Sequence, residues 1–289
     1  MLFVCATPIG NLGDVSRRLL DTLATVQYIA CEDTRHTLKL LTHYAIKGPR
    51  LISLHEHNET QRVEELLPLL REGADIALVS DAGTPLISDP GYELIRACRK
   101  EGIAVTAIPG ASAAVVALVL SGLPVDRVLF TGFLPRRHDQ LEELLDDASR
   151  VQATLVAFES PRRVRGTLGV LAESACEVEV AMCRELTKVH EEVIVGSPGE
   201  VAARMPERVR GEIVLVVRVL KEALLPLPQD PADEESYVHD LLRDQLHTKD
   251  IAQRLAERLG CSRSAAYRRV LEIRKKWAGT TRVTNKIKD

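Results

Sequence analysis

The chain has 289 residues, of which 45% are hydrophobic, and this content is sufficient for two modest cores. Charged residues make up 27% and the formal net charge is −3. This balance is ordinary for a soluble protein, and it excludes a protein that is strongly basic over its whole length. Only 3% of the residues are aromatic, which excludes a large aromatic stacking surface.

The six cysteines are scattered and form no CxxC pair. This pattern favours reduced, partly buried thiols in a cytoplasmic protein. The apolar run at residues 1–6 is much shorter than the ~18 residues that a membrane-spanning helix needs, and no basic segment precedes it. We therefore expect a first strand there rather than a signal peptide, and no membrane partner.

Residues 1–121 alternate between short apolar runs and segments with helical spacing, which predicts an N-terminal α/β domain. Strands are expected at residues 2–6, 27–31, 50–54, 76–80 and 104–108. Helices are expected after these strands, at residues 16–25, up to 43, 61–71, 92–101 and 111–121. Such an alternation is typical of a mostly parallel five-stranded sheet that is covered by helices on both faces.

Residues 122–222 are less regular and predict a second α/β domain. Strands are expected at residues 128–132, 154–158, 177–183, 190–195 and 212–219, and helices at residues 139–148 and 163–174. Because the last strands follow one another without a predicted helix, we expect antiparallel pairs and a mixed sheet.

The C-terminal part begins with a proline-containing linker, residues 223–234. A small helical unit, resembling a helix-turn-helix, is expected at residues 235–289, with helices at 235–245, 249–259 and 263–277. Residues 262–289 carry nine Lys or Arg against two acids, a net charge of +7. A basic helix favours contact with nucleic-acid phosphates, although a solvated helix end has the same composition.

Polar residues follow the predicted strands of the first domain. Gly10 and Gly13 follow the first strand, and Glu32 and Asp33 end the second, which resembles half of a dinucleotide-binding fingerprint or simply a tight turn. Arg35 suits a phosphate, or an ion pair with a neighbouring acid. The stretch His55–Glu59 has the spacing of a metal cluster, but without supporting ligands it favours substrate contact or a polar turn, and we expect no metal.

The loop Ser80–Gly91 is the most specific stretch. Asp81 can accept hydrogen bonds, Gly83 lets a ligand approach the backbone, and two prolines restrict the path of the chain. Residues 109–112 place small side chains and a helix N-terminus at the same edge. In open α/β sheets this edge binds ligands, so we expect one site at the carboxyl ends of the first five strands.

Together these loops resemble the bacterial 16S ribosomal RNA cytidine 2′-O-methyltransferases of the tetrapyrrole-methylase-like class. The matching motifs are Ala6–Asp14, Glu32–Thr37, Val79–Gly91, Pro109–Ser112, Gly132–Pro135, Phe158–Pro161, Arg184–Lys188 and Gly211–Glu212. Two departures from the family pattern are Arg162, where a His is frequent, and the short basic run Arg136–His138.

The resemblance implies two α/β domains with a cleft for S-adenosyl-L-methionine between them. It implies methylation of a cytidine ribose in the decoding region of 16S rRNA, within the small ribosomal subunit, by a homodimer. The implied cofactor-binding residues are Pro8, Asp81, Ala82, Gly83, Thr84, Pro109, Gly110, Ser112, Ala113, Phe158, Met182, Leu186, Gly211, Glu212 and Ile213.

The implied RNA-binding residues are Gly10, Asn11, Gly13, Arg35, His36, Asn58, Arg162, Arg163, Lys188, Arg263, Arg268 and Arg269. The candidates for the group that removes the hydroxyl proton are Glu32, Asp33, His55 and His57. The alternatives are a tetrapyrrole or other small-molecule methyltransferase of the same fold, a DNA-binding module in the tail, and a dehydrogenase that binds NAD.

Overall fold

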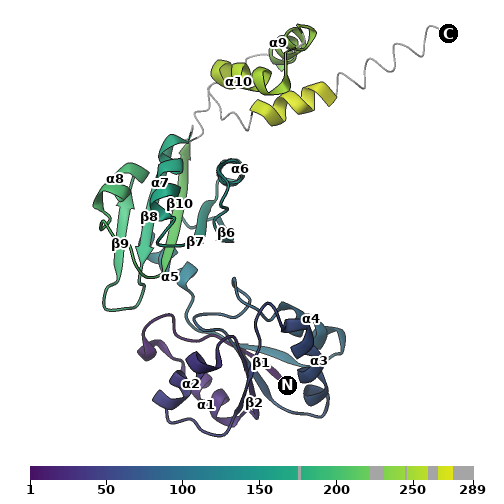
Figure 1. The fold of residues 1–289 in the computed structure, drawn as a ribbon, viewed down its shortest axis with the longest axis vertical. Helices are drawn as coiled ribbons and strands as arrows, with labels where there is room; N and C mark the ends of the chain where they lie inside the picture. The colour runs from purple at the N-terminus through teal and green to yellow at the C-terminus, as the bar shows by residue number, and fades with distance from the viewer. Residues whose placement is uncertain (175–176, 222–230, 245, 260–265, 276–289) are drawn as a thin grey trace, which may run out of the picture. The chain divides into compact units, whose positions relative to one another are not determined.

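The computed structural model describes residues 1–174, 177–221, 231–244, 246–259 and 266–275 (Figure 1). The chain divides into two compact units. The first contains residues 1–120 together with 183–193 and 211–214, and the second contains 121–182, 194–210 and the chain from Leu215 onward. The boundary after Leu120 is one residue from the predicted one. Residues 183–193 and 211–214 also belong to the first unit, although the predicted domains are continuous segments of the chain.

The first unit is built on a five-stranded sheet with the order β3-β2-β4-β1-β5. The strands are β1 (Leu2–Cys5), β2 (Tyr28–Cys31), β3 (Arg50–Ser53), β4 (Ile76–Val79) and β5 (Val105–Ile108). Every pair of neighbours is parallel, as the sequence predicts. All five strands therefore end at the same edge, and β4 is the central strand with β2 and β1 on either side of it, so the loops after β4 and β1 are neighbours at that edge.

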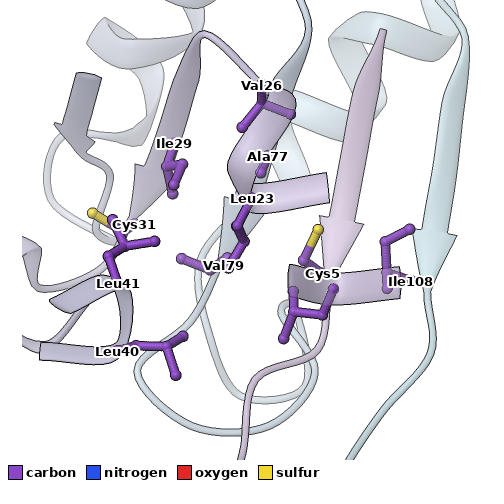
Figure 2. Packing of buried hydrophobic residues seen from close by; sticks show 11 residues of the cluster. Cys5, Leu23, Val26, Ile29, Cys31, Leu40, Leu41, Ala77, Val79 and Ile108 are labelled. Carbon is purple, nitrogen blue, oxygen red and sulfur yellow. The ribbon is translucent and has the colours of Figure 1, made fainter. Parts of the chain in front are cut away.

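Helices cover both faces of this sheet, because its strands bury both sets of side chains. The helices are α1 (Arg17–Thr25), α2 (Thr34–His43), α3 (Glu59–Arg71) and α4 (Tyr92–Lys100), with α5 (Ala113–Ser121) following β5. Leu23 of α1 and Leu41 of α2 pack with Cys5 and Val79 on one face (Figure 2). Leu66 of α3 and Leu94 of α4 pack with Leu2, Ile76 and Leu78 on the other.

The second unit contains a sheet with the order β6-β7-β10-β8-β9. Its strands are β6 (Val128–Phe133), β7 (Thr154–Glu159), β8 (Glu177–Arg184), β9 (Glu192–Gly196) and β10 (Ile213–Lys221). The sheet is mixed, as predicted, and its helices include α6 (His138–Arg150) and α7 (Val164–Glu173).

A short helix, α8 (Pro198–Arg204), separates β9 from β10, where the sequence analysis expects none. The Ser197 side chain caps it by accepting from the Glu200 N–H, and the Glu200 carboxylate accepts from the Ser197 N–H in a capping box. The Ser-x-x-Glu spacing with a proline at the first helical position is the signal that predicts this helix.

The C-terminal part contains α9 (Pro231–Arg243), α10 (Thr248–Leu259) and a helix over residues 266–275. Their apolar sides form a small core that includes Val238, Ile251, Leu255, Ala266 and Val270. Residues 260–265, which hold the turn of the predicted helix-turn-helix and Arg263, lie outside the described residues, as do residues 223–230 of the predicted linker. The remaining residues of that linker, 231–234, belong to α9, which begins four residues before the predicted helix.

A carboxylate from α3 anchors the end of the loop 80–91 in the first unit. Oε1 of Glu59 accepts hydrogen bonds from the backbone N–H groups of Gly91, at 3.0 Å, and Glu93, at 2.8 Å. These groups begin α4 and have no acceptor within that helix, so Glu59 acts as its N-terminal cap from outside.

Replacing this carboxylate tests its role. We expect Glu59→Ala to lower the free energy of unfolding by about 1–2 kcal/mol, because two backbone donors lose a charged acceptor. Glu56→Ala, at an exposed position of the same turn, is the control and should change stability by less than about 0.5 kcal/mol. Equal effects of the two substitutions in urea denaturation would contradict the cap.

Candidate functional site

The loops after β1 and β4 are joined by a reciprocal pair of backbone hydrogen bonds. The Thr7 N–H donates to the Gly83 carbonyl oxygen at 2.8 Å, and the Gly83 N–H donates to the Thr7 oxygen at 3.1 Å. The buried Thr7 hydroxyl also donates to the Ser80 carbonyl oxygen at 3.2 Å. The loops after these two neighbouring strands are therefore held together.

Two of the predicted cofactor-binding glycines, Gly110 and Gly83, are required by the backbone, Gly110 because of close packing and Gly83 because of its φ angle. A Cβ on Gly110 would lie 3.2 Å from the Ala6 carbonyl oxygen and 3.0 Å from the Ala6 Cβ, so the loop after β5 approaches β1 too closely for a side chain. Gly83 has a φ of 85°, which L side chains rarely adopt.

Positive φ angles also occur at non-glycine residues in the loop after β4. Leu86 has a φ of 74° and Ser88 a φ of 71°. Such angles cost of order 1–3 kcal/mol each and persist where the surroundings impose them, which is common at ligand sites. This loop therefore has the backbone character of a functional segment as well as its composition.

Three carboxylates gather at this edge: Glu32 after β2, and Asp81 and Asp89 from the loop after β4. Burial raises the pKa of Asp89 to about 6, and the negative charges of Glu32 and Asp81 also raise it. A hydrogen bond from Ser80 lowers this pKa in part. Burial, then the charge of Asp81, also raises the pKa of Glu32. Asp89 is not among the residues predicted from the sequence, although it lies in the loop Ser80–Gly91, the most specific stretch of the chain.

Asp33, beside Glu32, has the opposite environment. Its carboxylate caps α2 by accepting from the Arg35 N–H at 2.8 Å, and it forms an ion pair with the Arg35 guanidinium at 2.7 Å. These hydrogen bonds hold the pKa of Asp33 well below its usual range. Arg35 thus takes the alternative that the sequence left open, an ion pair with a neighbouring acid.

The stretch 55–59 forms a local turn. The Asn58 side chain accepts from the His55 N–H at 2.8 Å and donates to the Ser53 carbonyl oxygen at 3.2 Å. The rings of His55 and His57 lie with their centroids 6.1 Å apart. Nδ1 of His55 is buried without a hydrogen-bond partner. In the part of the chain that the structure describes, no group of three His, Cys, Asp or Glu residues is arranged to hold a metal ion.

Lys188, from the segment after β8 that belongs to the first unit, lies against the loop after β1. Its ammonium is 2.8 Å from Glu185 Oε1 and 2.9 Å from Glu212 Oε2. A Cβ on Gly10 would lie 2.5 Å from Lys188 Cγ, so Gly10 makes room for this side chain. Burial alone would raise the pKa of Glu185, but hydrogen bonds from the Lys188 ammonium and the Glu212 N–H hold this pKa below its ordinary value. Gly211 is equally constrained, because a Cβ there would lie 2.4 Å from Glu185.

Other predicted RNA-binding cations also have partners. Arg163 donates to the carbonyl oxygens of Leu134 and Pro135, and lies 3.3 Å from Glu159. Arg268 pairs with Asp146 at 2.7 Å, and Arg269 with Glu234 at 2.5 Å. Arg162 is exposed, as is Asn11, whose side chain accepts from the Gly13 N–H.

The predicted cofactor-binding residues of the second unit are mostly apolar. Phe158 packs edge-on against Phe130 and Phe133, with ring centroids 5.4 and 5.7 Å apart, and Met182 is fully buried. The segments 183–193 and 211–214 bring Leu186, Gly211, Glu212 and Ile213 into the first unit. Their assignment to the cofactor stays a prediction, as does that of Phe158 and Met182.

The chain matches a known protein family and curated relatives over most of its length. A sequence model of the Tetrapyrrole (Corrin/Porphyrin) Methylases matches residues 1–202. Ribosomal RNA small subunit methyltransferase I of Escherichia coli O157:H7 is 43% identical over 278 residues, which is 94% of each chain. The protein of that name from Halalkalibacterium halodurans is 47% identical over 226 residues, 78% of each chain.

Solved structures support the same fold. Diphthine synthase superposes with a TM-score of 0.57 at 13% identity, covering 75% of this chain and 89% of that one. The methyltransferase CobJ has a TM-score of 0.56 at 20% identity, covering 74% and 92%. Among the described residues, no helix is long and apolar enough to cross a membrane.

The raised pKa of Asp89 predicts a pH-dependent gain from removing its charge. Between about pH 4 and pH 6 the folded protein binds the proton that the unfolded chain has lost, so this group lowers stability as the pH rises and its full cost is present above pH 6. We expect Asp89→Asn to stabilise the protein by about 1–3 kcal/mol at pH 7.5, and by much less at pH 4.5.

Urea denaturation at both pH values measures this difference. Asp126→Asn, at an exposed position, is the matched control and should have no comparable pH-dependent effect. A stabilisation by Asp89→Asn that is the same at both pH values would contradict the buried, charge-repelled carboxylate.

Proposed function

Because the chain belongs to the tetrapyrrole methylase family and, within it, to the ribosomal RNA small subunit methyltransferase I proteins, we propose that it transfers a methyl group from S-adenosyl-L-methionine to the 2′-oxygen of a cytidine in 16S rRNA. The observation that carries this proposal is a relative of that name at 43% identity over 94% of both chains. The proposed substrate is the decoding region of the small ribosomal subunit.

The cofactor proposal rests on the glycine-containing loops at the sheet edge. Gly110 is exposed and lies too close to Ala6 for a Cβ, and Gly83 adopts a φ of 85° beside it. The helix α5 begins at Ala113, three residues after Gly110, with the N–H groups that a helix leaves without partners. A polar ligand with a carboxylate and hydroxyl groups fits such a surface. A uroporphyrin-III C-methyltransferase of this fold has been solved with S-adenosyl homocysteine. We propose that residues 82–84 and 109–113 hold the cofactor.

When bound, S-adenosylmethionine supplies a methyl group on a sulfonium, which is already activated for transfer to an oxygen. The protein has to align the ribose 2′-oxygen with that methyl group and accept the hydroxyl proton. Alignment alone is worth up to about 7–11 kcal/mol in favourable cases. The joined loops after β1 and β4 provide a rigid frame for it.

The environments of the four candidate bases rank them. Glu32 has a raised pKa, and a carboxylate whose pKa is closer to neutrality is the stronger base. Asp33 is held as a weak base by Arg35. The His55 side chain is half-buried, with its Nδ1 enclosed and without a partner, whereas His57 is exposed. We propose Glu32 as the base and His55 as a group that orients the substrate.

The RNA contacts and the oligomeric state are further parts of the proposal. With Arg35, Arg163, Lys188, Arg268 and Arg269 paired to acids or carbonyl groups, we propose that these cations chiefly position their loops. The exposed Arg162 and the basic end of the chain are left to contact phosphates.

A homodimer stays a prediction, and α5 offers an exposed apolar side with Val115 and Val119 for it. Sedimentation of the purified protein measures that state.

The proposal is tested by incubating the protein with small ribosomal subunits and methyl-labelled S-adenosylmethionine, followed by mapping of the modified nucleotide. We expect label on the 2′-oxygen of one cytidine of 16S rRNA. Glu32→Gln should lower the transfer rate about 100-fold or more, because a general base contributes 10²–10⁴-fold, and should leave the cofactor dissociation constant within twofold.

Glu64→Gln, which changes an exposed carboxylate on α3 outside the candidate site, is the control and should keep the wild-type rate. Label on a base rather than on a ribose, or methylation of a tetrapyrrole in place of the subunit, would contradict the proposed reaction. A full rate in Glu32→Gln would remove only the assignment of the base.

A further inference from the structure

A pocket of about 230 Å³ lies at the sheet edge in the first unit, between the loop after β1, the first turns of α2 and the start of the loop after β4. Its lining residues are Thr7, Pro8, Leu12, His36, Thr37, Lys39, Leu40, Ser80 and Asp81. Leu12, Lys39 and Leu40 belong to none of the predicted sites. All the lining residues come from the first 120 residues, so the pocket is complete within one unit.

The size of the pocket restricts its occupant. Sites that enclose a whole drug-sized ligand have volumes of about 300–1,000 Å³. A pocket of about 230 Å³ is smaller than this range, so it suits one flat ring rather than an entire S-adenosylmethionine. Pro8, Leu12 and Leu40 supply apolar surface, and apolar side chains on the two sides of a flipped base are a common arrangement in enzymes that act on nucleotides.

The polar groups of the pocket restrict the occupant further. Asp81 Oδ1 accepts from the Asp33 N–H at 3.1 Å, and its Oδ2 is 3.8 Å from His36 Nδ1, which is beyond hydrogen-bond distance. The carboxylate has more lone pairs than this one bond uses, so it can accept another donor. An acceptor and an imidazole N–H donor therefore stand side by side.

This pair matches cytosine and not uracil. Cytosine presents its N4 amino group as a donor next to N3, an acceptor, and carboxylates pair with the N4 amino group. Uracil presents a carbonyl oxygen and an N–H in these places, so both contacts would be reversed. A carboxylate facing a carbonyl oxygen is unfavourable because neither group can donate.

We propose that this pocket receives the base of the target cytidine, with Asp81 accepting from the N4 amino group and His36 donating to N3. This inference rests on the proposed function and adds to it the site that selects the nucleotide. It moves Asp81 from the predicted cofactor-binding residues to the RNA. Lys39, which also lines the pocket, places a cation for the adjoining phosphate.

Asp81→Asn tests the proposal through base preference. The substitution keeps the volume of the side chain, but its amide can donate to the carbonyl oxygen of uracil. The substrates are small subunits assembled with 16S rRNA that carries either cytidine or uridine at the mapped position. We expect the wild-type protein to prefer cytidine at least tenfold, and Asp81→Asn to reduce this preference at least tenfold, with the cofactor dissociation constant within twofold by calorimetry.

His36→Ala provides a second measurement should Asp81→Asn fail to fold, since this exposed side chain can be removed with little effect on packing. It should also reduce the preference for cytidine and leave cofactor binding unchanged. Asp21→Asn, at an exposed position of α1, is the control and should keep the wild-type ratio.

An unchanged preference in the folded variants would overturn the proposal. So would a tenfold loss of cofactor affinity in Asp81→Asn with an unchanged preference, which would return Asp81 to the cofactor. Both outcomes leave the proposed methylation standing. If the wild-type protein does not methylate the small subunit at all, the proposed function itself fails, and this inference with it.

Discussion

The exchange of backbone hydrogen bonds between Thr7 and Gly83 is the constraint on which the candidate site depends. It joins the loop after the central strand, β4, to the loop after its neighbour β1, and the order of the parallel sheet sets the positions of both strands. The pocket, the three carboxylates and the close approach of Gly110 to Ala6 all lie on these loops or beside them. Loss of this bridge would separate the groups that the proposed reaction needs within a few ångströms of one another.

The carboxylates of this edge illustrate how one environment produces different acids and bases. Asp33 and Glu32 are adjacent in the sequence, yet an arginine lowers the pKa of the first while burial and a like charge raise the pKa of the second. The burial that destabilises ionised Glu32 and Asp89 is a cost to folding that serves the chemistry. The positive φ angles of Leu86 and Ser88 are a second energetic cost in the loop that contains Asp89.

Several cations in the described part of the chain hold loops together. Lys188 links two glutamates and lies against Gly10, and Arg163 binds two carbonyl groups and Glu159. These pairs need space, which Gly10 and Gly211 provide. A count of Lys and Arg along the sequence therefore overstates the charge that is free to meet a phosphate, because the acids that neutralise it come from distant segments.

The five-stranded parallel sheet, the mixed second sheet and the loops that form the edge can be predicted from the amino-acid sequence, since periodicity, glycines and prolines act locally. The sequence also pointed to Asp81, Gly83 and Gly110 through composition and family resemblance. Only the tertiary structure decided that Glu59 caps α4, that Asp89 joins Glu32 and Asp81, and that Lys39 and Leu40 line a pocket. These relations depend on contacts between segments that are far apart in the chain, and on burial, which no local pattern of residues encodes.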